Sequence, residues 1–339
     1  MSRMRAMVVQ EPGKGLYLEE RDIPAPGRHE VLIRVRACGV CHSDSVSVEG
    51  LFPGLAYPLI PGHEVIGVIE AIGPDVEGWE VGTRVGVGWS PGACGWCAHC
   101  RRGDIFACDT IKGATGVSRD GGYATHMLAL TSALARVPAN LDSIESAPLL
   151  CAGITTFNAL RHCGAVPGDL VAVHGVGGLG HLGIQFAARA GYRTVAVNRG
   201  RDKEKLAREL GAHDYIDSDA TDPAAALQAM GGAKAILATV TNAQAMQAIS
   251  GGLGPNGTLM AIGAVGALTV DSLDLLTKRA AVKGWYSGTA ADSEDTLAFS
   301  KLHNIVSMNE IYPLEQAQAA YDRMMSGKAR FRVVLRMDG

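Results

Sequence analysis

Eight cysteines are spread unevenly along this 339-residue chain, and four of them are close enough to share one metal ion. Cys94, Cys97, Cys100 and Cys108 follow the spacing C-x2-C-x2-C-x7-C. Four thiolates on one loop can close a tetrahedral shell around Zn2+ and leave no position for a substrate. Iron–sulfur clusters use similar spacing, but usually with proline after the last cysteine, whereas Asp109 follows here. The cluster therefore predicts a structural zinc site.

Three further metal-binding side chains are far apart in the sequence: Cys41 in GVCHSD, His63 in PGHEV and Cys151 in LLCAGITTF. Brought together, two thiolates and one imidazole leave a zinc ion with a fourth position open for water or substrate. An open zinc can polarise a carbonyl group or lower the pKa of an alcohol, so that hydride leaves its carbon. Because an isolated buried cysteine usually serves packing, this prediction depends on the other motifs of the chain.

A glycine-rich turn indicates a dinucleotide site. In the segment VAVHGVGGLGHLG, the pattern G-x-G-x-x-G falls on Gly175, Gly177 and Gly180, with Gly178 and Leu179 inside the turn. The pattern follows an apolar strand candidate and opens a helix candidate, which is the context that the motif requires. Such glycines allow a tight turn and a close approach of a pyrophosphate to the helix N-terminus.

The choice between the two nicotinamide dinucleotides depends on the end of the following strand, in VAVNRGRDK. Asn198 stands where NAD enzymes usually place an acidic residue that accepts from the ribose hydroxyls. Arg199 and Lys203 can supply charge-assisted hydrogen bonds to a 2′-phosphate. The pattern therefore favours NADP. NAD is the alternative, because Arg199, Arg201 and Lys203 are also compatible with the solvent-facing start of a helix.

The elements that must position these residues differ in character along the chain. Residues 1–150 contain short apolar β segments punctuated by glycine and proline, which indicate a β-rich domain with long loops. The clearest are VLIRVRAC (31–38), VIGVIEAIG (65–73) and GTRVGVGW (82–89), the last with glycines that suggest bulges or tight bends.

From about residue 151, apolar strands alternate with helical patterns, which predicts a doubly wound α/β domain with a parallel sheet. The strand candidates begin the segments 170–191 and 194–212 and recur at 234–240 and 257–266. A helix candidate at 314–327 and a strand candidate at 331–337 close the chain.

Composition excludes several classes of function. A formal net charge of −3 argues against extensive electrostatic binding to nucleic acid or anionic lipid. The chain starts without a secretory signal and contains no apolar run of the roughly 18 residues that a membrane span needs. We therefore expect a cytoplasmic protein, in which reduced cysteines serve metal binding or catalysis.

Taken in order, GHE, the four-cysteine loop, CAGITT and GVGGLG identify a resemblance to the zinc-dependent alcohol dehydrogenases of the medium-chain dehydrogenase/reductase family. The resemblance implies an α/β fold in which a Rossmann domain with a doubly wound parallel sheet (153–289) is inserted into a β-rich GroES-like catalytic domain (1–152 and 290–339). The cofactor segment is similar to that of the cinnamyl alcohol dehydrogenase-like relatives.

The resemblance also implies an activity: interconversion of primary alcohols and aldehydes by hydride transfer with NADP(H), with two Zn2+ per chain in a homotetramer. The alternatives are an NAD(H)-dependent alcohol dehydrogenase or a secondary-alcohol or polyol dehydrogenase on the same scaffold. A protein that binds zinc and dinucleotide without catalysis is a further alternative, which the complete set of open-zinc ligands disfavours.

By the same resemblance, Cys41, His63 and Cys151 are ligands of the catalytic zinc. Glu64 approaches the metal during ligand exchange, Asp44 accepts a hydrogen bond from the imidazole of His63, and Ser43 receives the alcohol proton. One position departs from the family: Val46 replaces a histidine that continues the proton relay in many relatives. The relay beyond Ser43 would then run through the cofactor ribose to water, or through another group.

Further roles follow from the resemblance alone. His42 and Arg332 are expected to contact the pyrophosphate, and Thr155 to lie beside the nicotinamide ring. Phe52 and Trp89 are expected to line a substrate pocket that favours unbranched or flat primary alcohols. The two remaining cysteines, Cys38 and Cys163, are expected to be buried thiols.

Overall fold

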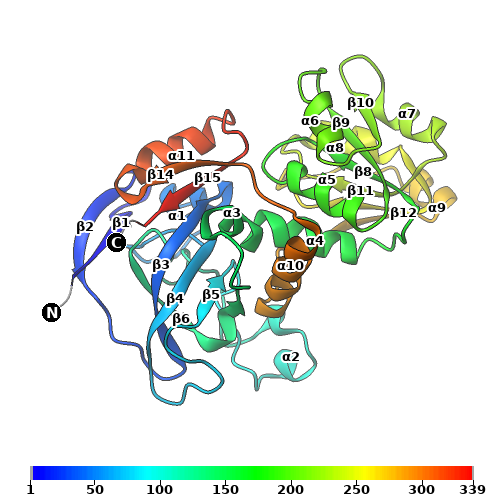
Figure 1. Cartoon of the computed structure of the whole chain (residues 1–339). Coiled ribbons are helices and arrows are strands. Elements are labelled where there is room, and N and C mark those ends of the chain that lie inside the picture. The colour runs from blue at the N-terminus through cyan, green and yellow to red at the C-terminus, as the bar shows by residue number, and fades with distance from the viewer. Residues whose placement is uncertain (1–2, 338–339) are drawn as a thin grey trace. The chain divides into compact units, whose positions relative to one another are not determined.

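The computed structural model describes residues 3–337 of the chain, which divides into two compact units. The first unit contains the two ends of the chain, up to Ile154 and from Gly288 onward, and the second unit is Thr155–Ser287. In Figure 1 the first unit is blue to green and orange to red, and the second is green to yellow. No helix within residues 3–337 is both long enough and apolar enough to cross a bilayer.

The first unit is built on a seven-stranded sheet that joins both ends of the chain. The strands run in the order β14 (Asn309–Pro313), β15 (Arg332–Arg336), β3 (Glu30–Val40), β4 (Val65–Ile72), β5 (Arg84–Val87) and β7 (Leu134–Arg136), with β6 (His126–Leu130) also paired to β3. A separate ladder pairs β1 (Arg3–Val8) with β2 (Tyr17–Asp22). The strands expected at 31–38, 65–73, 82–89 and 331–337 are confirmed as β3, β4, β5 and β15.

The central strand β3 pairs with β15, β4 and β6. All its residues are buried except Glu30, Arg34 and Arg36, which explains the apolar character of the rest of its sequence. The core of the unit gathers residues from distant parts of the chain, including Val8, Ile33, Tyr123 and Leu335. Burial of these side chains is the main force that holds the C-terminal strand against the N-terminal ones.

The expected bulges in β5 are wrong. The register of β5 with β4 and with β7 shows no shift. Gly86 in β5 and Gly88 just after it instead make room for a neighbour: a Cβ atom at Gly86 would lie 2.8 Å from the Leu150 side chain, and one at Gly88 would lie 2.8 Å from the Leu150 carbonyl oxygen. The glycines therefore let the segment before Cys151 approach the sheet.

The helices of the first unit are short except at its C-terminal end. They are α1 (Ser45–Val48), α2 (Ala98–Arg101), α3 (Ser143–Ser146), α10 (Ala290–His303) and α11 (Ala317–Met325). The helix expected at 314–327 begins as the 3-10 turn Leu314–Gln316 and continues as α11. Helix α10 starts with a capping box between Thr289 and Asp292 and ends at Asn304 in a left-handed conformation.

The second unit is a doubly wound parallel sheet, as expected from the alternation of strands and helices. Its strands lie in the order β10 (Asp214–Asp217), β9 (Arg193–Asn198), β8 (Leu170–His174), β11 (Ala233–Ala238), β12 (Leu253–Ala261) and β13 (Ala281–Gly284). Numbered by their appearance in this unit, they follow 3-2-1-4-5-6, the order of dinucleotide-binding domains. The chain order reverses between β8 and β11.

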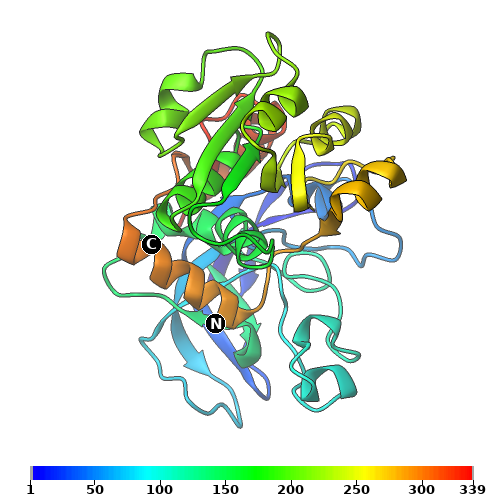
Figure 2. The same cartoon turned by 90° about the vertical axis from the view of Figure 1, so that its right-hand side faces the viewer.

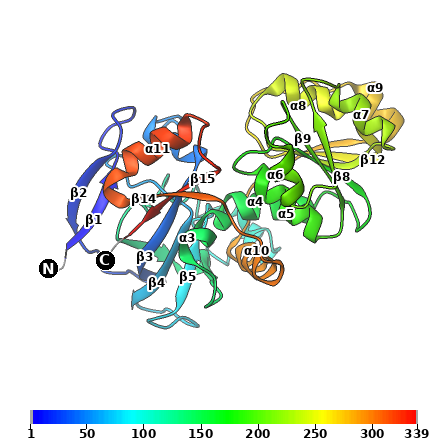
Figure 3. The ribbon, with the colours of Figure 1, turned by 45° about the horizontal axis from the view of Figure 1, so that its top comes forward.

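Helices cover both faces of this sheet. In Figure 3, α5 (Gly180–Arg189) and α6 (Glu204–Glu209) lie on one side of the strands, and α7 (Pro223–Ala229), α8 (Ala243–Ser250) and α9 (Ser272–Lys278) lie toward the other. Because both faces are covered, β8 is buried along its whole length, and β11 is buried at every position except Lys234. Helix α4 (Ala152–Arg161) contains the boundary between the two units.

Candidate active site

The four cysteines of the C-x2-C-x2-C-x7-C motif come together on one loop of the first unit. The sulfur atoms of Cys94, Cys97, Cys100 and Cys108 all lie within 4.8 Å of one another. The loop carries α2 and extends away from the sheet of its unit (Figures 1 and 2). Four sulfur donors at these distances can form a closed tetrahedral zinc shell.

Backbone amides point at these sulfurs. The N–H groups of Cys97, Cys100 and Ile111 donate to the sulfurs of Cys94, Cys97 and Cys108 over 3.4, 3.5 and 3.3 Å. Burial raises the pKa of Cys94, but the amide hydrogen bonds outweigh it and hold that pKa at about 6. The amides therefore favour the thiolate of Cys94, the form that binds zinc, whereas burial raises the pKa of Cys100.

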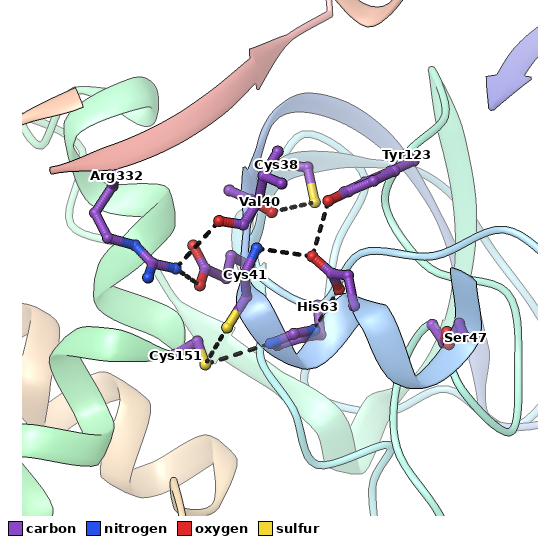
Figure 4. A network of polar contacts seen from close by, with 12 residues as sticks. Cys38, Val40, Cys41, Ser47, His63, Tyr123, Cys151 and Arg332 are labelled. Carbon is purple, nitrogen blue, oxygen red and sulfur yellow. Dashed lines mark hydrogen bonds and ion pairs between the residues drawn. The ribbon is translucent and has the colours of Figure 1, made fainter. Parts of the chain in front are cut away.

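A second group of donors converges elsewhere in the same unit, where ligand atoms of Cys41, His63, Glu64 and Cys151 all lie within 4.8 Å of one another. The Cys41 and Cys151 sulfurs are 3.7 Å apart, and the Nε2 atom of His63 is 3.3 Å from the Cys151 sulfur. Figure 4 shows the two sulfurs and the imidazole pointing at one another. Three donors of this kind suit an open zinc site.

Sheet register brings these residues together. Cys41 directly follows β3, and His63 and Glu64 directly precede β4, which pairs antiparallel with β3 so that Cys38 faces Val65. Cys151 belongs to a different part of the chain and directly follows the 3-10 turn Ala147–Leu150. Leu150, the last residue of that turn, lies close to Gly86 and Gly88, and Cys151 follows it directly.

Asp44 fixes the imidazole ring of His63. Its Oδ1 atom lies 3.0 Å from Nδ1 of His63, and both side chains are buried. Because Nδ1 donates its proton to this carboxylate, Nε2 is unprotonated, and its lone pair is available to a metal ion next to the two sulfurs. Oδ2 of Asp44 accepts from the Cys41 amide and from the Tyr123 hydroxyl, each over 2.8 Å.

Glu64 forms a buried ion pair with Arg332 at the edge of the same site. Arg332 donates to Oε1 of Glu64 and, over 3.4 Å, to the Val40 carbonyl oxygen. Burial raises the pKa of Glu64 to about 8, although the Arg332 guanidinium lowers it. Within residues 3–337, Oε2 of Glu64 and Nε of Arg332 make no hydrogen bond. These orphaned polar atoms beside two thiolates fit a site that binds a metal ion or an anion.

Trp89 and Phe52 differ in their relation to this site. The Trp89 ring meets the imidazole of His63 edge-on, with the ring centroids 4.8 Å apart. The Phe52 side chain is 53% exposed. Trp89 therefore forms a wall of the metal site, whereas the role expected for Phe52 stays a prediction.

Two residues expected in the proton relay and at the cofactor lie on the turn after Cys41. His42 and Ser43 belong to the 3-10 turn His42–Asp44, where His42 is exposed and Ser43 is partly buried. Thr155 lies in α4. Their contacts with a cofactor stay predictions, as does that of Arg332, whose guanidinium the structure places on Glu64.

In the second unit, a cavity of about 690 Å³ lies at the carboxyl ends of the parallel strands. This is where open α/β sheets bind ligands, at the point where the strand order reverses. The lining contains five of the residues expected at the cofactor, which come from the glycine turn and from the end of β9 and the residues after it, and it adds residues that the sequence did not indicate. Its polar and glycine lining includes His174, Gly175, Gly177, Asn198, Arg199, Lys203, Ser218, Asp219, Thr239, Thr241 and Asn242.

The glycine turn has the geometry that a close ligand requires. Gly175 has a positive φ of 100°, and a Cβ atom at Gly180 would lie 1.7 Å from the Gly175 carbonyl oxygen. Gly178 and Leu179 complete the turn, and α5 begins at Gly180. At Gly177 an added Cβ would meet no atom within 4 Å. The turn is therefore tight on its inner side and open at Gly177, which fits the approach of a pyrophosphate.

The side chains at the end of β9 are held by the glycine turn. Asn198 accepts from the Val176 amide over 3.1 Å and donates to the Arg199 carbonyl over 2.9 Å. Lys203 donates to the Val176 carbonyl over 2.6 Å. Burial lowers the pKa of His174 to about 4, so its imidazole is uncharged at neutral pH. The cationic side chains of the cavity are thus Arg199 and Lys203, with Asp219 as its carboxylate.

Two protein-family models match the chain, one in each unit for most of its length. Residues 27–139 match the alcohol dehydrogenase GroES-like domain, and residues 178–302 match the family described as zinc-binding dehydrogenase. The chain is 43% identical over 336 residues to an alcohol dehydrogenase of Penicillium expansum, covering 99% of this chain and 98% of that protein. It is 38% identical over 338 residues to an alcohol dehydrogenase of Geobacillus stearothermophilus, covering 98% and 99%.

Solved structures share the whole fold. The CAD of Helicobacter pylori, complexed with NADP(H), aligns with a TM-score of 0.87 and 26% identity, covering 99% of this chain and 98% of that one. A cinnamyl alcohol dehydrogenase of Sorghum bicolor aligns with a TM-score of 0.86 and 27% identity, with the same coverage. The GroES-like and Rossmann-like parts expected from the sequence are both confirmed.

Proposed function

Since this chain belongs to the zinc-dependent alcohol dehydrogenases of the medium-chain dehydrogenase/reductase family, we propose that it interconverts primary alcohols and aldehydes by hydride transfer with NADP(H). The observation that carries the proposal is the convergence of Cys41, His63 and Cys151, whose donor atoms lie within 4.8 Å of one another and of a Glu64 carboxylate oxygen. A metal site with three protein ligands is the arrangement used for catalysis. Bound there, zinc supplies the Lewis acid, and the nicotinamide cofactor carries the hydride.

The residues of the chain take complementary roles in this proposal. Cys41, His63 and Cys151 hold the catalytic zinc, and Asp44 orients the imidazole of His63. Ser43, two residues after Cys41, accepts the proton of the alcohol. The four-cysteine loop holds a second, structural zinc. The tetrameric state and the cytoplasmic location stay predictions from the resemblance.

We assign cofactor binding to the second unit, with the glycine turn at the pyrophosphate. The preference for NADP is supported by the absence of a carboxylate at Asn198 and by the two cations that line the same cavity, Arg199 and Lys203. The amide of Asn198 is occupied by backbone groups, so it holds the turn. A 2′-phosphate would be paired by Arg199, whose guanidinium is suited to bidentate contacts.

The test is kcat/KM for reduction of one aromatic aldehyde, with NADPH and NADH compared side by side. We expect NADPH to be preferred at least tenfold, about 1.4 kcal/mol of discrimination. Arg199→Ala should reduce this preference by raising KM for NADPH. Arg201→Ala is the matched control, because Arg201 is an exposed neighbour that pairs with Glu204 over 3.6 Å.

The other outcomes of this assay select the alternatives. A preference for NADH would contradict the assignment of Arg199 and leave an NAD(H)-dependent alcohol dehydrogenase. Faster oxidation of branched secondary alcohols than of primary ones would favour a secondary-alcohol or polyol dehydrogenase. Zinc binding without turnover of any of these substrates would indicate a binding protein.

A further inference from the structure

We propose that Tyr123 is a positioning residue of the catalytic metal site, which acts on the zinc ligand His63 through the carboxylate of Asp44. The inference rests on the proposed function, because it assumes that His63 holds a zinc ion. Tyr123 lies 60 positions after His63 in the sequence, between Gly122 and Ala124, and no spacing motif marks it. The Tyr123 hydroxyl donates to Asp44, and Asp44 in turn contacts His63; Figure 4 labels Tyr123 and His63 at the two ends of this series.

The carboxylate of Asp44 accepts hydrogen bonds from three donors and is almost completely buried. Its side chain is 2% exposed, and Oδ2 accepts from both the Cys41 amide and the Tyr123 hydroxyl over 2.8 Å. These two donors hold Oδ2 from two directions, which leaves Oδ1 directed at Nδ1 of His63, 3.0 Å away. The phenol therefore sets the rotation of the carboxylate that orients the imidazole.

The ring of Tyr123 is itself held in place. It is fully buried, and a Cβ atom at Gly62 would lie 2.4 Å from its Cδ1 atom. Its backbone N–H donates to the Pro61 carbonyl over 3.0 Å, and its carbonyl accepts from the Met7 amide over 2.8 Å. Tyr123 is thus joined by its backbone to the loop that carries His63 and by its hydroxyl to the turn that carries Asp44.

Loss of the hydroxyl would leave Oδ2 of Asp44 with the Cys41 amide as its one remaining donor among the described contacts. A buried carboxylate with an unfilled hydrogen-bonding position turns toward other donors, and the hydrogen bond to His63 is weakened. Substitution of such outer partners of a metal ligand typically costs about 10- to 100-fold in metal affinity or activity. We expect a loss in this range for Tyr123→Phe, which retains the ring.

The experiment measures the rate at which the purified enzyme releases zinc to a colorimetric chelator, rather than activity. Cys151→Ser, which removes a catalytic ligand, identifies the phase that belongs to the catalytic site. Tyr123→Phe should release that zinc at least tenfold faster than the wild type and leave the zinc of the four-cysteine loop unaffected. Tyr321→Phe is the matched control, since Tyr321 is also buried and its hydroxyl donates to Glu49 over 3.2 Å.

A double-mutant cycle separates positioning from packing. In the Asp44→Asn background, Tyr123→Phe should change the release rate by less than about twofold, because the group through which it acts is altered. An equal acceleration in both backgrounds would overturn the proposal, as would a release rate like that of the wild type. Faster loss of both zinc ions with a large fall in Tm would also overturn it, since the hydroxyl would then support the unit as a whole.

Failure of the proposed function would look different. If Cys151→Ser releases the same zinc phases as the wild type, no zinc is bound at Cys41, His63 and Cys151, and the inference falls with the function. If Cys151→Ser loses one phase and Tyr123→Phe leaves that phase unchanged, the function stands and the inference alone is wrong.

Discussion

The buried polar side chains of the proposed catalytic site each depend on a few hydrogen-bonding partners, so the loss of one partner by substitution has an interpretable effect. Asp44 is engaged by three donors, and the pair formed by Glu64 and Arg332 is buried. Ser43 differs, because it lies on a turn of three residues and is only partly buried, whereas Tyr123 is fully buried. A serine that transfers a proton can therefore be tested without disturbing the metal site.

We predict that Ser43→Ala lowers kcat by about 100-fold or more, which is the usual value of a positioned acid–base group. Val46→Ala should change kcat by less than about threefold, because an aliphatic side chain transfers no proton. Steady-state kinetics at constant zinc content is the measurement. Equal and small losses in both variants would remove Ser43 from the relay.

At the scale of elements, the sites are built where strands end. The ends of β3 and β4 carry Cys41 and His63, and the carboxyl ends of β8, β9 and β11 surround the cavity of the second unit. Glycines permit the close approaches at both places, at Gly88 beside Leu150 and at Gly180 beside Gly175. Within the glycine turn, however, Gly177 and Gly180 serve different purposes.

We therefore predict that Gly180→Ala lowers the stability of the protein, whereas Gly177→Ala weakens cofactor binding. At Gly180, the new methyl group would collide with the Gly175 carbonyl oxygen, so we expect a loss of stability of roughly 1–3 kcal/mol or more. At Gly177, the methyl group meets no protein atom, so stability should be unchanged while the Kd for NADPH rises at least tenfold. Thermal unfolding and a fluorescence titration measure the two effects. Unchanged NADPH binding by Gly177→Ala would contradict a close approach of the cofactor there.

At the scale of the whole molecule, metal binding and dinucleotide binding are assigned to different units. Both candidate zinc sites belong to the first unit, and the nucleotide cavity belongs to the second. Each unit also has a hydrophobic core of its own, around Ile33 and Val65 in the first and around Val195 and Ile236 in the second. Metal removal should thus weaken the two units unequally.

We predict that a strong chelator increases amide hydrogen exchange in the first unit, above all in the four-cysteine loop, because metal-binding free energy is folding free energy at such sites. The parallel strands β8 and β11 of the second unit should keep their protection, because their hydrogen bonds and core involve no metal ligand. Hydrogen exchange resolved by mass spectrometry distinguishes the units. A uniform loss of protection in both would show that they unfold together.

Several features follow from the sequence by itself, because they depend on residues that are close neighbours in the chain. The spacing of Cys94, Cys97 and Cys100 places three sulfurs on one loop, and the alternation of strands and helices predicts the doubly wound sheet. The glycine turn is equally local, since its pattern and its flanking elements lie within one strand and one helix.

Other features were decided only by the tertiary structure, because they join residues whose separation in the chain carries no information about distance. The register of β3 with β4 and the packing over Gly88 bring Cys151 to Cys41 and His63, which the sequence had suggested through family resemblance alone. Tyr123 was not indicated at all, because its contact with Asp44 depends on the packing of a buried ring. A long-range hydrogen bond leaves no periodic signal in a single sequence, and folding alone creates it.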